Sequence, residues 1–157
     1  IFDGLVQPGQ TVLDIGCGAG HFSLGLACLL GPSGMVIAAD LQPAMLAKVR
    51  ARAERAGLQQ YIQLHQCSRE SIGLNEEVDI VLAFWMVHEV PDKQLFMKQL
   101  YQVLKPGGKL LLVEPKVHVS ERAFHGTLKK AEEMGFITIE PRKVYLSRAF
   151  LLGKGVG

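Results

Sequence analysis

The chain has 157 residues and a net charge of +2, and 48% of its residues are hydrophobic while 20% are charged. This length is typical of one domain, which at this size buries roughly 70% of the surface that the unfolded chain exposes. Lysine and arginine form no basic run, so the composition gives no indication of a nucleic-acid partner. The three cysteines, Cys17, Cys28 and Cys67, form no C-x-x-C pair and indicate neither a disulfide framework nor a zinc site. We therefore expect a single domain over residues 1–157 in a cytoplasmic protein.

The chain begins at Ile1 rather than at a methionine. We therefore expect that a further N-terminal segment belongs to the protein. No uninterrupted apolar run approaches the ~20 residues that a membrane-spanning helix needs. We expect no membrane span.

The most informative stretch reads VLDIGCGAG and occupies residues 12–20. An apolar strand ends there at Asp14, and three glycines follow at alternate positions. Such glycines allow a sharp turn with positive φ and let the backbone approach a ligand without a Cβ in the way. The apolar run at residues 22–30 predicts a packed helix, whose first N–H groups would face the same ligand. Strand, glycine turn and helix in this order indicate a nucleotide-binding loop.

The later segments alternate between strands and helices. Strands are predicted at residues 35–40, 61–65, 78–84 and 109–114, and helices are predicted after Pro43, Asp92 and Ser120. The sequence KPGG at residues 105–108 is expected to end the second of these helices. Two further strands, at 136–140 and 144–152, are separated by only three residues, which is too short for a crossover helix. The pattern predicts a mostly parallel α/β sheet with helices on both faces and a C-terminal antiparallel hairpin.

Ligands of open parallel sheets bind outside the carboxyl ends of the strands. Asp40 ends the second strand about twenty residues beyond the glycine turn, a spacing at which an acid can accept hydrogen bonds from both hydroxyls of a ribose. A carboxylate there disfavours a 2′-phosphate and therefore an NADP-type ligand. Asp40 can instead be an ordinary acid that caps the helix beginning at Pro43.

Two aromatic residues follow the fourth strand. His88 either lines a substrate pocket or packs in the core, and the same alternatives hold for Trp85. Adjacent residues such as His88 and Glu89 rarely converge on one metal ion, so we expect no metal site. His65 and His118 share no spacing with other histidines and receive no role.

Four motifs in order resemble the S-adenosylmethionine-dependent methyltransferases of the Rossmann-like class. They are VLDIGCGAG at 12–20, Asp40 after an apolar strand, Asp79 at the start of the fourth strand, and LKPGGKL at 104–110. The resemblance covers nearly the whole chain and is closest to the small-molecule branch that includes ubiquinone/menaquinone-biosynthesis and arsenite methyltransferases. It implies a Rossmann-like three-layer sandwich with a mostly parallel seven-stranded sheet and an antiparallel C-terminal hairpin. We expect a structural role for Asp79, because it lies at the end of its strand opposite the binding edge.

The resemblance also implies that S-adenosylmethionine is bound and that S-adenosylhomocysteine is a product. The implied cofactor-binding residues are Asp14, Ile15, Gly16, Cys17, Gly18, Gly20, Asp40, Leu41, Cys67, Ser68 and Ala83. Within this set the glycine turn would surround the methionine portion, Asp40 would hold the ribose, and Leu41 with Ile72 would cover the adenine. Cys67 stands where the family usually has an aspartate. The contact to the adenine amino group must therefore come from the backbone or from Ser68, or be lost.

Methyl transfer to a small-molecule acceptor needs alignment of the acceptor with the carbon–sulfur bond, and it needs a base only if the acceptor must lose a proton. His88 is the first candidate for such a base and Glu114 the second, and neither is assigned.

Two other functions remain open. An NAD-binding oxidoreductase would share the strand, turn and acid, but its fingerprint is G-x-G-x-x-G and this chain has G-x-G-x-G. A non-catalytic relative would bind the cofactor and act through partners. The apolar C-terminal hairpin can also form the edge of a homodimer.

Overall fold

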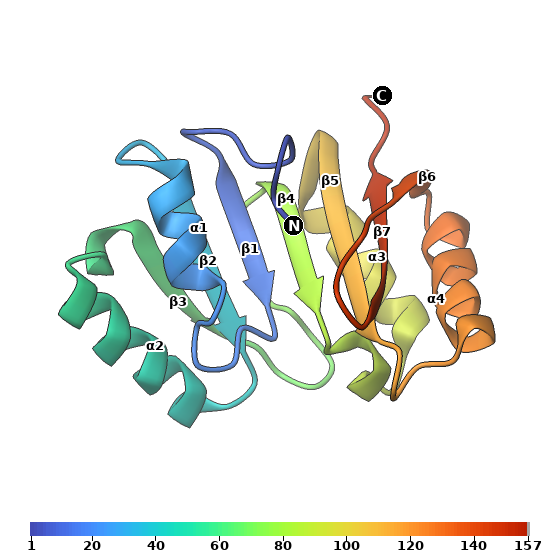
Figure 1. Cartoon of the computed structure of the whole chain (residues 1–157), viewed down its shortest axis with the longest axis horizontal. Coiled ribbons are helices and arrows are strands. Elements are labelled where there is room, and N and C mark those ends of the chain that lie inside the picture. The colour runs from blue at the N-terminus through green and yellow to red at the C-terminus, as the bar shows by residue number, and fades with distance from the viewer. Residues whose placement is uncertain (157) are drawn as a thin grey trace. The chain divides into compact units, whose positions relative to one another are not determined.

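The computed structural model describes residues 1–156 and confirms the predicted fold class. Seven strands form a mixed, mostly parallel sheet with antiparallel strands at its C-terminal end, and helices flank it in a Rossmann-like α/β arrangement (Figure 1). The chain divides into two compact units. We call residues 2–74 the N-terminal unit and the part that begins at Asn75 the C-terminal unit.

The N-terminal unit has three parallel strands in the order β3-β2-β1. Its elements are β1 (Thr11–Ile15), α1 (Ser23–Leu30), β2 (Met35–Asp40), α2 (Pro43–Ala56), the short 3₁₀ helix η1 (Gln59–Tyr61) and β3 (Ile62–Gln66). Both α1 and α2 contact β2. Apolar side chains such as Leu13 and Ile37 fill the core, because parallel strands covered by helices carry long apolar runs.

The C-terminal unit has four strands in the order β4-β5-β7-β6. Its elements are β4 (Val78–Phe84), the 3₁₀ helix η2 (Val87–Glu89), α3 (Lys93–Val103), β5 (Leu104–Pro115), α4 (Glu121–Glu133), β6 (Ile137–Pro141) and β7 (Ser147–Gly153). The pair β4–β5 is parallel, whereas β7 is antiparallel to both β5 and β6. The antiparallel C-terminal hairpin is thus confirmed.

The helices begin and end where capping residues place them. The side chain of Asp92 accepts a hydrogen bond from the Leu95 N–H at 2.9 Å, and Ser120 accepts one from Ala123 at 3.2 Å. The helix α2 stops at Gly57, whose φ of 68° is left-handed. No helix within residues 1–156 is long and apolar enough to cross a membrane.

The structure of the LKPGG segment differs from the predicted one. The sequence predicts a turn between a helix and a strand, but β5 already begins at Leu104 and includes these residues. The strand pairing shifts register between Val78 and Ile80, which accommodates the left-handed Gly107 with its φ of 76°. The Lys105 ammonium lies 2.9 Å from the Asp79 carboxylate at this irregularity. Asp79 therefore has the structural role expected of it.

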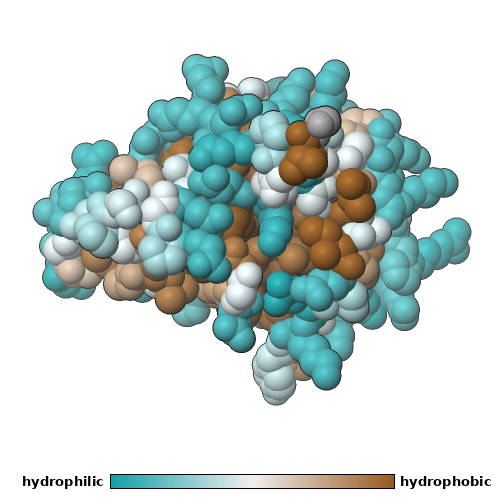
Figure 2. Space-filling model, turned by 90° about the horizontal axis from the view of Figure 1, so that it is seen from above, coloured by the Kyte–Doolittle hydropathy of each residue, from teal (hydrophilic) through white to brown (hydrophobic). Residues whose placement is uncertain are grey.

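The outer strand of the C-terminal unit exposes apolar side chains. Ile137 and Ile139 of β6 are 60% and 50% exposed. Figure 2 shows hydrophobic side chains as brown patches among hydrophilic ones on the face that it draws. β6 belongs to the hairpin at which we expected a homodimer edge, and the homodimer stays a prediction.

Candidate active site

The glycine turn after β1 has the predicted geometry. Gly16, Gly18 and Gly20 have φ values of 71°, 53° and 78°, which side chains disfavour. A Cβ at Gly20 would lie 3.1 Å from a methyl group of Val49, whereas a Cβ at Gly18 would meet nothing within 4 Å. The backbone at Gly20 therefore packs closely against α2, and the backbone at Gly18 borders open space that a ligand can occupy.

Asp14 is buried at the end of β1. Its side chain is 2% exposed and accepts a hydrogen bond of 2.6 Å from the Ser23 hydroxyl at the start of α1. Burial raises the pKa of Asp14 to about 6, and the Asp40 carboxylate adds to this rise while Ser23 opposes it. Ser23 was not among the predicted site residues, and its partner lies nine positions away. This part of the site favours a positively charged group beside Asp14.

Asp40 lies beside the glycine turn. One carboxylate oxygen accepts the Gly18 N–H at 2.9 Å, and the other accepts the Gln42 N–H at 2.9 Å. The alternative that Asp40 caps α2 is wrong, because Gln42 is the N-cap residue of that helix. A carboxylate offers about four acceptor sites. Two of these take backbone N–H groups, and the others are free to accept hydroxyl groups of a ligand.

The segment after β3 carries the predicted adenine contacts. The Cys67 N–H donates to the Asp40 carbonyl at 3.0 Å, and burial raises the pKa of the Cys67 thiol to about 11. Burial also raises the pKa of Cys17, so both thiols are neutral near pH 7 and neither is an activated nucleophile. His65, which received no role, places a ring nitrogen 2.6 Å from the Ile72 carbonyl and so fixes this segment.

The two apolar residues of the N-terminal unit that were expected to cover the adenine differ in exposure. Leu41 is exposed after β2, whereas Ile72 is buried. Leu41 can therefore contact a ligand directly. In the C-terminal unit, the predicted Ala83 is fully buried within β4.

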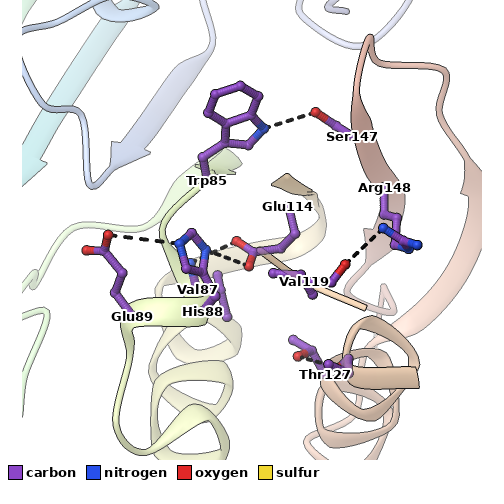
Figure 3. A network of polar contacts seen from close by, with 10 residues as sticks. Trp85, Val87, His88, Glu89, Glu114, Val119, Thr127, Ser147 and Arg148 are labelled. Atoms are coloured by element: carbon purple, nitrogen blue, oxygen red, sulfur yellow. Dashed lines mark hydrogen bonds and ion pairs between the residues drawn. The ribbon is translucent and has the colours of Figure 1, made fainter. Parts of the chain in front are cut away.

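Trp85 follows β4 in a strained conformation. Its φ of 56° is left-handed, which is uncommon for a bulky residue and is typical of functional sites. The Trp85 N–H donates to the Val113 carbonyl at 2.8 Å, and the indole N–H donates to the Ser147 hydroxyl at 3.0 Å (Figure 3). The ring stacks on Phe84 and remains 45% exposed. These contacts hold a flat apolar surface toward solvent.

His88 and Glu114, the two candidate bases, contact each other. The Nδ1 atom of His88 lies 2.9 Å from a carboxylate oxygen of Glu114, whose other oxygen accepts the Val87 N–H at 3.0 Å (Figure 3). Glu114 is 2% exposed. Burial raises the pKa of Glu114, and His88 together with the backbone donors opposes that rise. Among residues 1–156, no three His, Cys, Asp or Glu side chains are arranged to hold a metal ion.

His118 is a neighbour of His88 that the sequence did not indicate. The two rings are stacked, with centroids 5.9 Å apart and planes at 17°. The turn after β5 places His118 there, because the N–H groups of His118 and Val119 both donate to the Pro115 carbonyl. Arg148 of β7 donates to the Val119 carbonyl at 2.9 Å and fixes the turn (Figure 3). The only sequence signal is the position of His118 four residues after Glu114.

Solved structures with this fold include methyltransferases. A SAM-dependent methyltransferase from Aquifex aeolicus has a TM-score of 0.83 and 22% identity, over 94% of this chain and 82% of that one. At this identity the likeness shows the fold alone. TrmN from Thermus thermophilus is 28% identical with a TM-score of 0.78, over 95% of this chain and 45% of that one.

Curated relatives resemble the chain over part of their length. The ubiquinone/menaquinone biosynthesis C-methyltransferase UbiE of Haemophilus ducreyi is 34% identical over 69% of this chain and 42% of its own length. The demethylmenaquinone methyltransferase of Lactobacillus johnsonii is 36% identical over 69% of this chain and 45% of its own. The chain thus matches less than half the length of these relatives. A family model described as methyltransferase domain matches residues 7–145, which is most of the chain. The protein therefore belongs to the methyltransferase domain family.

Proposed function

We propose that the protein transfers a methyl group from S-adenosylmethionine to a small-molecule acceptor. The observation that carries this proposal is the hydrogen bond from the Gly18 N–H to Asp40, which joins the glycine turn to the carboxylate that follows β2. Gly18 borders open space, and Asp40 retains free acceptor sites for hydroxyl groups. Family membership supports the same function.

The residues of the N-terminal unit fit the chemical parts of this cofactor. When bound, it supplies an electrophilic methyl group on a positively charged sulfur. The backbone from Asp14 to Gly20 would hold the amino-acid portion, and the buried Asp14 would favour its positive charge. Asp40 would accept the ribose hydroxyls, and the exposed Leu41 would cover the adenine. Further proposed contacts in this unit are Ile15, Cys17, Cys67 and Ser68. A role for Ala83, which is fully buried in the C-terminal unit, stays a prediction.

We propose a ring compound of the quinone or quinol type as the acceptor. The curated relatives named above are quinone-biosynthesis and demethylmenaquinone methyltransferases. The exposed indole of Trp85 offers a flat apolar surface on which an aromatic ring can stack. Methylation would then take place at a ring carbon, as the name C-methyltransferase states for the first relative.

Calorimetric titration tests the cofactor. We expect S-adenosylmethionine and S-adenosylhomocysteine to bind and NAD not to bind. Asp40→Asn should weaken binding of both ligands at least tenfold, because an amide loses half of the acceptor sites. Asp92→Asn is the matched control, since asparagine caps a helix as well as aspartate does. Tight binding of NAD without binding of S-adenosylmethionine would overturn the proposal in favour of an oxidoreductase.

A second experiment tests catalysis. The chain is incubated with methyl-labelled S-adenosylmethionine and 1,4-naphthoquinone kept reduced under anaerobic conditions. We expect labelled 2-methyl product. Cofactor binding without a labelled product from this probe or from a cell extract would instead support a non-catalytic relative.

A further inference from the structure

We propose that His88, Glu114 and His118 form one proton-accepting group, in which the Nε2 atom of His88 takes a proton from a hydroxyl group of the acceptor. Glu114 and His118 are positioning residues that act through His88. This inference rests on the proposed function and narrows its acceptor to a phenol, quinol or enol with an acidic hydroxyl group.

Glu114 determines which nitrogen of His88 is free. Its carboxylate is buried and receives the Val87 N–H on one oxygen and His88 Nδ1 on the other. When Glu114 is ionised, its carboxylate only accepts hydrogen bonds, and Nδ1 of His88 then carries the hydrogen. In the neutral ring the lone pair is then on Nε2. This nitrogen lies 3.9 Å from the exposed carboxylate of Glu89, on the side of the ring away from Glu114 (Figure 3).

His118 limits the orientation of the His88 ring. Its ring is stacked on that of His88, and its backbone is held by the turn after β5 and by Arg148. The ring of His88 is thus held at its edge by Glu114 and on one face by His118. Within residues 1–156, the charged and titratable groups that contact this ring are Glu114 from β5, Glu89 from η2 and His118 from the turn.

The proton balance of the transfer follows from this placement. The acceptor hydroxyl loses its proton to Nε2, and the resulting imidazolium is stabilised by the carboxylate of Glu114 at 2.9 Å. The ring carbon of the acceptor forms a bond to the methyl group, while the methyl–sulfur bond breaks and its electron pair stays on sulfur. The hydrogen of that ring carbon then leaves as a proton to water, which restores the aromatic ring as a phenolate. The imidazolium of His88 returns its proton to the phenolate oxygen and becomes neutral again.

Nitrogen-15 NMR of the histidine rings tests the positioning role of Glu114 without any activity. In the wild type we expect a protonated Nδ1 and an unprotonated Nε2 for neutral His88. Glu114→Gln should reverse this assignment, because the amide nitrogen donates to Nδ1 while the amide oxygen still accepts the Val87 N–H. A wild-type His88 with the hydrogen on Nε2 would overturn the inference, whatever the cofactor experiments show.

Kinetics with labelled S-adenosylmethionine and reduced 1,4-naphthoquinone test the catalytic role. His88→Gln should lower kcat about 100-fold or more, within the range known for loss of a general base. Glu114→Gln should lower kcat by about tenfold and shift the acid limb of its pH profile. Calorimetric affinity for S-adenosylmethionine should stay within about twofold of wild type in both. A kcat for His88→Gln within about threefold of wild type would contradict the inference while leaving the proposed function intact.

His118 is tested by two substitutions. His118→Ala should lower kcat severalfold, and His118→Phe should restore most of it because phenylalanine keeps a stacked ring without a titratable group. His125→Gln, on the exposed side of α4, is the matched histidine control and should leave kcat unchanged. Equal losses in the alanine and phenylalanine variants would show that the imidazole itself is needed and would overturn the positioning role of His118.

Discussion

Each unit of the protein contains one carboxylate that is 2% exposed at or near the end of a strand, Asp14 in the N-terminal unit and Glu114 in the C-terminal unit. Burial raises the pKa of both. Their neighbours differ, because Asp14 has the hydroxyl of Ser23 and the like charge of Asp40, whereas Glu114 has a backbone N–H and the ring of His88. Glu114 therefore has a cationic partner within the protein when His88 is protonated. No ion pair joins Asp14 to a cationic side chain within residues 1–156, and the proposed cofactor would supply a positive charge beside it.

The largest expected effect concerns the pH dependence of stability at Asp14. Its folded pKa of about 6 lies above the ordinary value of 3.8, so the folded state holds a proton that the unfolded state releases. The contribution of Asp14 to stability is present below pH 3.8 and is lost as the pH rises through about 6. Asparagine does not titrate, so the variant does not lose this contribution. The unfolding free energy of Asp14→Asn minus that of wild type should therefore rise by about 3 kcal/mol from pH 3.5 to pH 7. Urea titrations across this range measure it, and a pH-independent difference would contradict the environment described for Asp14.

Ser23→Ala should have the next largest effect. The substitution leaves the buried carboxylate of Asp14 without its hydroxyl donor and should cost about 1–3 kcal/mol in unfolding free energy. The loss should be greater at pH 7 than at pH 5, because the hydroxyl stabilises the ionised form. The control is Ser33→Ala, at an exposed turn position. Equal losses at both pH values would mean that Ser23 contributes packing alone.

Gly18→Ala should separate stability from binding in the glycine turn. Alanine at the left-handed φ of Gly18 should cost about 1–2 kcal/mol in unfolding free energy. The new methyl group would meet no atom of the protein within 4 Å. The methyl group would enter the space proposed for the cofactor, so S-adenosylmethionine affinity should fall at least tenfold. Gly57→Ala, at a left-handed position with a φ of 68° and equally open surroundings, serves as the control with unchanged affinity. An unchanged affinity in Gly18→Ala would place the cofactor elsewhere.

Asp79→Asn should have the smallest effect. The ion pair with Lys105 is partly exposed, and such pairs contribute about 0–1 kcal/mol. Cofactor affinity should not change. A loss of affinity without a loss of stability would contradict the structural role assigned to Asp79.

The fold could be predicted from local patterns, whereas part of the candidate site could not. Alternating apolar runs, Gly57 and the caps at Asp92 and Ser120 act within a few residues, and each is visible in the sequence. The KPGG residues at 105–108 lie within β5 but have no partner in β4, because the pair Val78–Leu104 is followed by the pair Ile80–Lys109. Their turn-like composition therefore forms an irregularity inside the strand, and a local pattern does not reveal that the strand begins before it.

The candidate site also contains residues that the sequence predicted and residues that it did not. The spacing of Asp40 from the glycine turn predicted a carboxylate beside that turn, and its hydrogen bond to Gly18 confirms the proximity. Ser23 and His118 could not be predicted, because their partners depend on how α1 packs against β1 and how a turn folds after β5. Neither contact follows a fixed spacing that a sequence pattern would reveal.

Binding of S-adenosylmethionine at two pH values tests the central claim most directly. If the N-terminal unit holds a cationic ligand beside Asp14, the affinity should be about tenfold higher at pH 7 than at pH 5, because most of the Asp14 side chains ionise between these values. The Asp14→Asn variant should show no such dependence. Calorimetry would contradict the account if wild-type affinity were the same at both pH values, or if the variant retained the full dependence.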